Sequence, residues 1–436
     1  MNLIKSNYLA YIIVHFTINI MNIYLLIYLP LYFFDVLNID RTELALTQLV
    51  SRSMLIFTIF LGYFFDKFSQ KKKKIISFSA IILLASFLLF LLFRNIIFWY
   101  GLFLSIGLVT RMVVQVGMSK LMFDLVKLND NLKKNFILVF NASSSFGAFI
   151  PTILFSIIVV DFYSFPHWNT FFMAGWFLSL PIIFIYFLIK ENDIKISETH
   201  NKEENTDSSS KIWLTILVYI SYFLFWGSYL FWYPLSSWIT SNFGQNAFKF
   251  YSSFYVIFFL FNLSGFFVAK RIYKKGNEKK IIIKGIFGIV ILFLVYPYVP
   301  FPIFFFLYSI EALIYGLVIP NFLHIIIDLS RRGKYENLKY QILQSSNYLG
   351  NAIFTSLGIF LSSYFSTTSL MVISAFLVLL ASFPLMVKKN GKSLVVDKKD
   401  FDAIKDKCSS LYVQEKQAYI KVFQNKREDL ENNRKF

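Results

Sequence analysis

Cysteine is almost absent from this sequence of 436 residues, and charged side chains are scarce. The one cysteine, Cys408, excludes an intrachain disulfide and a cysteine-based metal site. The four histidines are scattered without the spacing of metal ligands, so we expect no metal and no cofactor. Charged residues make up 16% of the chain, against about 25% in a soluble domain. Since 57% of the residues are hydrophobic, a soluble fold could not cover its apolar surface, and the composition indicates a membrane protein.

Long, continuously apolar runs dominate what is present. A helix needs about 20 apolar residues to cross the hydrocarbon core, and the runs show no alternation typical of a membrane β-strand. The first run exceeds the roughly 7–15 apolar residues of a signal peptide and lacks a small-residue cleavage site, so it is interpreted as a spanning helix. Twelve spans are predicted, at 8–34, 44–65, 75–93, 97–121, 136–160, 168–189, 212–239, 251–269, 281–299, 302–327, 340–364 and 368–387.

The net charge of +18 is distributed in a way that indicates topology rather than nucleic-acid binding. With both ends of the chain inside, 38 of the 43 Lys and Arg residues fall in inner segments. Only Arg41, Arg94 and Lys249 fall in outer loops, and two further arginines lie within spans. Because cytoplasmic loops carry the excess of Lys and Arg, we expect a multi-pass protein of the cell membrane with both termini cytoplasmic.

Two polar stretches divide the chain. Residues 191–211 are charged and serine-rich, so they are interpreted as a cytoplasmic loop between a first half, 1–190, and a second half, 212–387. Residues 388–436 form a charged tail whose apolar residues recur at helical spacing, which favours a cytoplasmic amphipathic helix.

The two halves resemble each other at an offset of 203 or 204 positions. Leu29-Pro30-Leu31 matches Tyr233-Pro234-Leu235, and Asp124-Leu125 matches Asp328-Leu329. Gly62 through Lys67 matches Gly265 through Lys270, with Ala269 in the place of Asp66. We therefore predict an all-α membrane protein with twelve transmembrane helices, in two six-helix halves related by a parallel pseudo-twofold repeat.

The segment Gly62-x-x-x-Asp66-Lys67-x-x-x-Lys71 resembles the loop signature of the major facilitator superfamily, Gly-x-x-x-Asp-Arg/Lys-x-Gly-Arg/Lys-Arg/Lys. Here Ser69 replaces the second glycine and Gln70 a basic residue. The resemblance in architecture covers residues 8–387, and it implies that helices 1, 4, 7 and 10 line a central cavity. It also implies that Gly62, Asp66 and Lys67 belong to a gate, in which Asp66 latches the cytoplasmic side against helix 11. The alternative is that they only determine topology.

Ionisable and polar residues inside the predicted spans are candidates for substrate binding or coupling, because a charge near the bilayer centre is costly. Arg111 and Glu311 lie on helices 4 and 10, and the offset pairs Arg111 with Tyr315, one turn from Glu311. We therefore expect Arg111 and Glu311 to face each other across the cavity. Arg111 would bind an anionic group and Glu311 would carry a proton. The alternative is a structural ion pair between the halves.

Weaker candidates are left with two interpretations each. Arg52 could contact substrate or extend its guanidinium outward to the membrane surface. His15 and Asn19, one turn apart, could line the cavity, or His15 could bond to a neighbouring helix. Three aromatic residues of helix 7 could stack on a substrate or simply pack, and these are Trp226, Tyr229 and Trp232.

The prediction for function is a secondary active transporter, not an enzyme, that moves a small solute by alternating access. The two membrane arginines favour an anionic solute, and a proton is the candidate coupling ion. We expect a monomer whose partners are a small molecule and the lipid bilayer, with no nucleic acid. The alternatives are an integral-membrane transferase, although the sequence has no clustered His, Asp or Glu site, and a non-transporting receptor or scaffold on the same fold.

Overall fold

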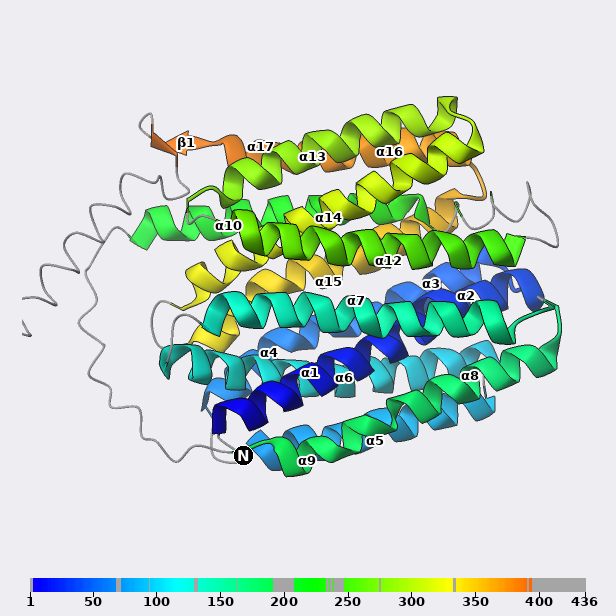
Figure 1. Cartoon of the computed structure of the whole chain (residues 1–436), viewed down its shortest axis with the longest axis horizontal. Helices are drawn as coiled ribbons and strands as arrows, with labels where there is room; N and C mark the ends of the chain where they lie inside the picture. Colours follow the sequence, from blue (N-terminus) through cyan, green and yellow to red (C-terminus); the bar gives the residue numbers. More distant parts are fainter. Residues whose placement is uncertain are drawn as a thin grey trace, which may run out of the picture.

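The structure is a computed structural model of the whole chain. It describes residues 3–67, 72–93, 95–128, 132–161, 163–190, 208–232, 235, 238, 247–273, 276–331, 335–389 and 392–393. Most of the predicted connection and tail lie outside the described residues, as do Tyr233 and Pro234 of the repeat and the predicted outer-loop residue Arg94. Within the described ranges the chain is almost entirely helical (Figure 1).

The helices of the first half follow the predicted runs with local breaks. Proline at position 30 and the short π-helical stretches beside it interrupt the first long helix, while a 3-10 turn interrupts the second. The elements are α1 (Leu3–Ile23), η1 (Tyr24–Tyr28), α2 (Leu29–Leu31), η2 (Tyr32–Val36), α3 (Arg41–Ser53), η3 (Met54–Phe57), α4 (Thr58–Lys67), α5 (Lys72–Phe93), α6 (Ile97–Leu128), α7 (Leu132–Ile158), α8 (Phe165–Ser179), η5 (Leu180–Phe184) and α9 (Ile185–Leu188).

The second half begins at Ser208, inside the predicted connection, so the first helical turn reaches further toward the N-terminus than expected. It ends in a hairpin of two very short antiparallel strands, which the sequence did not indicate. The elements are α10 (Ser208–Phe225), η7 (Trp226–Leu230), α12 (Ala247–Ile272), α13 (Glu278–Val295), η9 (Tyr296–Tyr298), α14 (Phe301–Ser330), α15 (Glu336–Leu361), α16 (Thr367–Leu380), α17 (Ser382–Met386), β1 (Lys388–Lys389) and β2 (Lys392–Ser393).

The described residues contain 10 helices that are long and apolar enough to cross a membrane. Large apolar side chains on their outer surface are exposed, such as Phe187 at 72% and Phe306 at 64%, as expected for contact with lipid tails. The chain is a multi-pass membrane protein. The other two predicted spans are helical but are not among the 10, and they correspond to α1 with its extensions and to α15. The count of twelve stays a prediction, as does the pseudo-twofold repeat.

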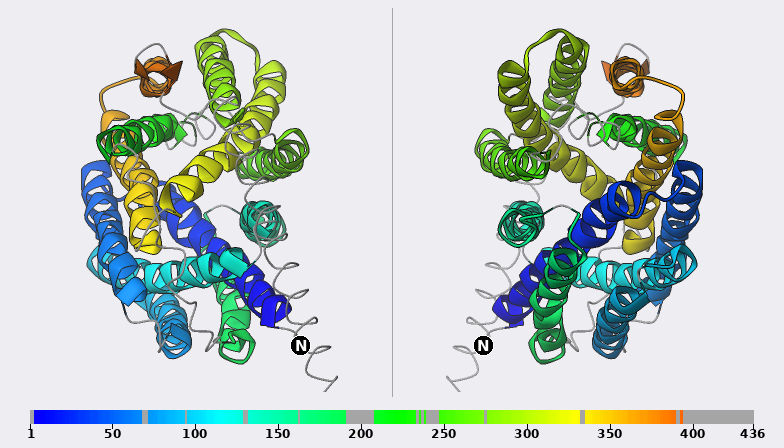
Figure 2. Two further views of the ribbon diagram at one scale, coloured as in Figure 1. Left: turned by 90° about the vertical axis from the view of Figure 1, so that its left-hand side faces the viewer. Right: turned by 90° about the vertical axis from the view of Figure 1, so that its right-hand side faces the viewer.

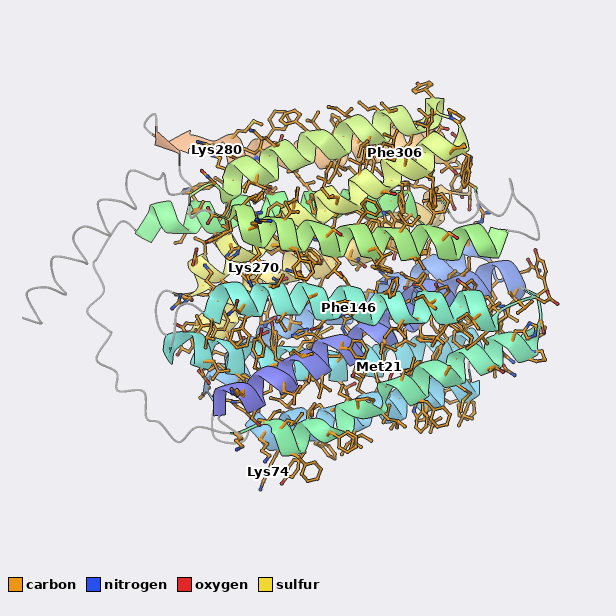
Figure 3. The ribbon with its side chains drawn as sticks, viewed as in Figure 1. Met21, Lys74, Phe146, Lys270, Lys280 and Phe306 are labelled. Atoms are coloured by element: carbon orange, nitrogen blue, oxygen red, sulfur yellow. The ribbon has the colours of Figure 1, made fainter. Side chains whose placement is uncertain are left out.

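The helices run roughly along the long axis of the molecule, and the halves lie side by side (Figures 1 and 2). Viewed along that axis, the first half, blue to teal, occupies one side and the second half, green to orange, the other (Figure 2). Helix α7 of the first half lies along α12 of the second, and α15 lies along α3 and α4. Lys74, Lys270 and Lys280 lie toward one end, the end where α1 begins (Figure 3). We call this the basic end.

Candidate functional site: a cavity between the two halves

A central cavity of about 330 Å³ lies between the two halves. Both halves line it. The first half contributes residues of α1, α3, α6 and α7, and the second contributes residues of α10, η7, α12, α14 and α15. Its lining is rich in amide and hydroxyl groups, and none of the described residues that line it is Asp or Glu. The size falls at the small end of the roughly 300–1,000 Å³ typical of small-molecule sites.

Arg111 reaches this cavity from the middle of α6. Its Nε is buried and has no hydrogen-bond partner among the described residues. A guanidinium carries five N–H donors and keeps its positive charge in proteins, so leaving a buried donor unmatched is costly. Arg111 is therefore a buried cation prepared for a partner that the protein does not supply.

Arg52 lines the same cavity from α3, and its side chain is satisfied by neutral oxygens. Its Nε donates to Gln48 Oε1 at 2.8 Å, and its Nη1 donates to Asn351 Oδ1 and, at 3.3 Å, to Thr355 Oγ1. The residue is only 3% exposed, so the interpretation that it extends outward to the membrane surface is wrong. These bonds join α3 of the first half to α15 of the second.

His15 and Asn19 line the cavity from α1, one helical turn apart. Asn19 Nδ2 donates to the His15 carbonyl oxygen at 2.8 Å and to Ser144 Oγ on α7 at 3.0 Å. The imidazole lies edge-on between the rings of Tyr11 and Phe140, at centroid distances of 4.3 and 4.5 Å. Both of its ring nitrogens are buried without a hydrogen-bond partner among the described residues, so the expected bond to a neighbouring helix is not found there.

Glu311 does not face Arg111, and the predicted encounter between them is wrong. Tyr315 lines the cavity, but Glu311, one turn earlier on α14, is fully buried away from it. There the Tyr296 hydroxyl of η9 donates to Glu311 Oε2, within the second half. A hydroxyl within the second half thus offers the carboxyl group a hydrogen bond away from the cavity. Glu311 Oε1 remains without a partner among the described residues.

Aromatic rings form part of the second-half lining of the cavity. Tyr229 and Trp232 are stacked, with centroids 5.3 Å apart and planes inclined by 17°. Trp226 lies 5.1 Å from Tyr229, and Phe258 of α12 meets Trp232 edge-on at 5.0 Å. All four line the cavity, and we call them the aromatic wall. The indole N–H groups of Trp226 and Trp232 are buried without a partner in the described part of the chain.

A polar stripe on α15 also lines the cavity, and the sequence analysis missed it. Its members recur at intervals of three and four, which places them on one face of a helix. A detectable signal was present, because 340–364 is unusually polar for a predicted span. The stripe consists of Gln341, Gln344, Tyr348, Asn351 and Thr355.

At the basic end, Asp66 joins the two halves. Its Oδ2 accepts a hydrogen bond at 2.9 Å from the backbone N–H of Leu338, in the first turn of α15, where the helix has no side-chain cap of its own. A carboxylate at this position satisfies a free donor and complements the positive end of the helix dipole. Lys120 of α6 pairs with the other oxygen of Asp66 at 3.1 Å. The structure thus contains the contact with helix 11 that the resemblance implied.

Gly62 and Lys67 lie near this contact on α4. A Cβ added at Gly62 would lie 3.0 Å from the Leu338 Cα, so glycine permits the close approach of α4 and α15. The Lys67 ammonium lies 5.8 Å from the centre of the Tyr63 ring, which in turn lies 5.7 Å from the ring of Tyr335.

A second link between the halves at the basic end was not predicted. Lys133 of α7 forms an ion pair with Asp328 of α14, and its Nζ also lies 3.5 Å from the His324 carbonyl oxygen. The offset makes Asp124 the counterpart of Asp328, but Asp124 pairs within its own half, with Lys72 at 2.7 Å and Lys120 at 3.5 Å. The basic end of the molecule is closed by contacts on both sides of the interface.

Comparison with known proteins identifies the fold. No family model matches the sequence, and no curated protein matches it. Among solved structures, the human organic anion transporter MFSD10 (TETRAN) superimposes with a TM-score of 0.64 at 12% identity, over 88% of this chain and 98% of that one. The nucleoside transporter NupG superimposes with a TM-score of 0.61 at 11% identity, over 89% of this chain and 100% of that one. The chain has the major facilitator fold.

In this major facilitator fold the cavity draws on more helices than the four expected. Besides α1, α6, η7 and α14, it takes residues from α3, α7, α12 and α15. The additional helices carry most of the amide groups of the lining, including Asn141, Asn262 and Asn347. Among the described residues there is no group of three or more His, Cys, Asp and Glu side chains that could hold a metal ion.

Proposed function

We propose that this protein is a secondary transporter that carries a small organic anion across the membrane by alternating access. The observation that supports the proposal most strongly is Arg111, a buried cation with an unmatched donor in a cavity whose described lining contains no carboxylate. A solved protein of the same fold is described as an organic anion transporter, which agrees with this substrate class.

The charges of the cavity make a positive site in a medium of low polarity. Arg111 and Arg52 both line it, and their like charges raise the energy of the empty cavity. A bound anion would relieve that repulsion and match the free donor of Arg111 with a charge-assisted hydrogen bond. A cation would meet two arginines in the described lining, and a neutral solute would leave the free donor of Arg111 without an anionic acceptor.

Alternating access requires a gate that can open at each end. At the basic end, Asp66 and Lys133 of the first half hold the second half, Asp66 at the start of α15 and Lys133 at Asp328 of α14. Opening at this end would break both links at once. The cavity would then exchange its solute with the compartment on the basic side, which the distribution of Lys and Arg predicts to be the cytoplasm.

Glu311 is the candidate proton carrier, but its position separates it from the anion. The carboxyl group is buried among Tyr296 and the rest of the second half, with one oxygen lacking a described partner. We therefore propose that proton and anion occupy different sites, and that Tyr315, which lines the cavity one turn from Glu311 on α14, connects them. Coupling would then operate through the conformation of α14.

Binding and uptake by Arg111 variants test the proposal. Replacing Arg111 by Met removes a charged hydrogen bond that contributes about 1.5–3 kcal/mol, which is a weakening of about 10- to 150-fold. Arg111→Lys keeps the charge but not the planar fork, so it should weaken binding less. Benzoate and acetate uptake into proteoliposomes and thermal-shift titrations of purified protein provide the measurements. Unchanged binding of anions by Arg111→Met would refute the role of Arg111.

A further inference from the structure

The cavity has a cationic wall and an aromatic wall, which belong to different halves. The first half contributes the cations Arg111 and Arg52, while amides come from both halves, including the polar stripe of α15. The second half presents the aromatic wall, formed by Trp226, Tyr229, Trp232 and Phe258. A solute that fills the space between the walls must therefore satisfy a cationic surface on one side and aromatic faces and edges on the other.

The aromatic wall also carries hydrogen-bond donors that lack a partner among the described residues. Buried tryptophans usually find a partner for the indole N–H, since a lost hydrogen bond is costly in a dry interior. Here two indole N–H groups that line the cavity, those of Trp226 and Trp232, have no partner among the described residues. Trp176 lies outside the lining, and its indole does donate, to the Leu84 carbonyl oxygen at 3.3 Å. The unmatched donors are thus found where a solute would supply the acceptor.

From these two walls we propose that the transported anion carries a flat aromatic ring, as an aromatic carboxylate does, with the acidic group on Arg111 and the ring against the aromatic wall. The proposal rests on the proposed function, because it takes anion binding at Arg111 as given. Offset or edge-to-face contacts with Tyr229 and Trp232 would hold the ring. An acceptor atom on the ring would accept a hydrogen bond from the indole N–H of Trp226 or Trp232.

Other occupants fit the two walls less well. Aromatic rings also attract organic cations, but Arg111 and Arg52 would repel such a ligand. A short aliphatic anion would satisfy the arginines and leave the aromatic wall facing water. A ring that links the two walls would also draw the halves together, since the arginines belong to the first half and the wall to the second.

Matched ligands separate the contribution of the ring from that of the charge. Purified full-length protein is titrated calorimetrically with benzoate, cyclohexanecarboxylate and benzylamine, which have similar size and differ in flatness or charge. We expect benzoate to bind about tenfold more tightly than cyclohexanecarboxylate, and benzylamine to bind more weakly than either. Trp232→Leu should remove the preference for benzoate. Trp213→Leu is the matched control, because Trp213 lies on α10, outside the cavity lining, and is 59% exposed.

The possible results distinguish the two levels of the proposal. Retained binding of cyclohexanecarboxylate by Trp232→Leu shows that the variant is folded, and with a lost benzoate preference it supports the inference. Equal binding of both acids by the wild type, or an unchanged preference in Trp232→Leu, overturns the aromatic ring and leaves anion transport standing. Binding of neither acid, binding that Arg111→Met does not weaken, or stronger binding of benzylamine overturns both.

Discussion

The ion pair between Lys133 and Asp328 should help to hold the basic end closed, and its contribution can be worked out from the structure. The side chain of Lys133 is 9% exposed and that of Asp328 is 34% exposed, so solvent screens the pair only in part. Exposed pairs contribute about 0.2–1 kcal/mol, and breaking a fully buried pair costs about 3–5 kcal/mol. We therefore expect a loss on the order of 1–2 kcal/mol, which lowers the ratio of closed to open conformers about 5- to 30-fold.

The two single variants should differ in a defined order. Asp328→Asn leaves the ammonium of Lys133 in a buried position with the His324 carbonyl oxygen at 3.5 Å, so the closed state loses more. Lys133→Met leaves the carboxylate of Asp328, which water already reaches, so the closed state loses less. Exchanging the two residues, with Lys133→Asp and Asp328→Lys, should restore most of the closure.

Pulsed electron paramagnetic resonance between spin labels measures this ratio. Cys408→Ser gives a background without cysteine, since the chain has one cysteine. Phe187→Cys on α9 and Ile272→Cys on α12 then place one label on each half near the basic end, at positions that are 72% and 43% exposed. We expect Asp328→Asn to increase the population at long distances.

Asp124→Asn is the matched control for this experiment. Asp124 is the counterpart of Asp328 in the predicted repeat, but its lysine partners belong to its own half. Removing its charge should therefore leave the distance distribution close to that of the background protein. If Asp328→Asn shifts the distribution no more than Asp124→Asn does, the reasoning that this pair closes the basic end is refuted.

Three further predictions follow from single features. Gly62→Ala should destabilise the closed basic end, because the new Cβ would lie 3.0 Å from the Leu338 Cα. Slower uptake and longer distances between the spin labels would show this destabilisation, and unchanged uptake and distances would contradict it. Glu311→Gln should abolish accumulation driven by a proton gradient while preserving anion exchange in proteoliposomes; retained accumulation would rule out a proton role. Tyr163→Cys, in the background without Cys408, should react with an impermeant maleimide on intact cells, whereas labelling only after permeabilisation would reverse the predicted orientation.

The sequence predicted the fold well because its strongest signal, the length and hydropathy of the apolar runs, is local. The breaks within helices depend on tertiary packing, so η3 and the π-helical stretches around Pro30 were not foreseen. The start of α10 at Ser208 was also missed. A serine-rich segment favours a loop by composition, whereas a helix that continues into a membrane span can extend through it.

Only those residues of the candidate site that are individually unusual in a membrane span could be predicted from the sequence. Arg111, Arg52, His15 and Asn19 are costly in a membrane span, and the structure places all four in the cavity lining. Glu311 was equally conspicuous, but the direction of its side chain depends on a hydrogen bond with Tyr296. No sequence pattern predicts that these two residues lie close together. The stripe on α15 was overlooked for the opposite reason, since each glutamine or asparagine is unremarkable until all are placed on one helix face.

The polarity of α15 has a consequence for how the protein is made. A helix enters the bilayer from the translocation machinery according to the summed cost of its side chains, and amides near the centre weigh against insertion. Helix α15 is not among the helices apolar enough to cross on their own, and it packs against α3 and α4 of the first half. We therefore expect it to insert with the help of the first half already in place. Mutations in α3 or α4 that loosen this contact would then appear in the cell as failed biogenesis and degradation, before any turnover could be measured.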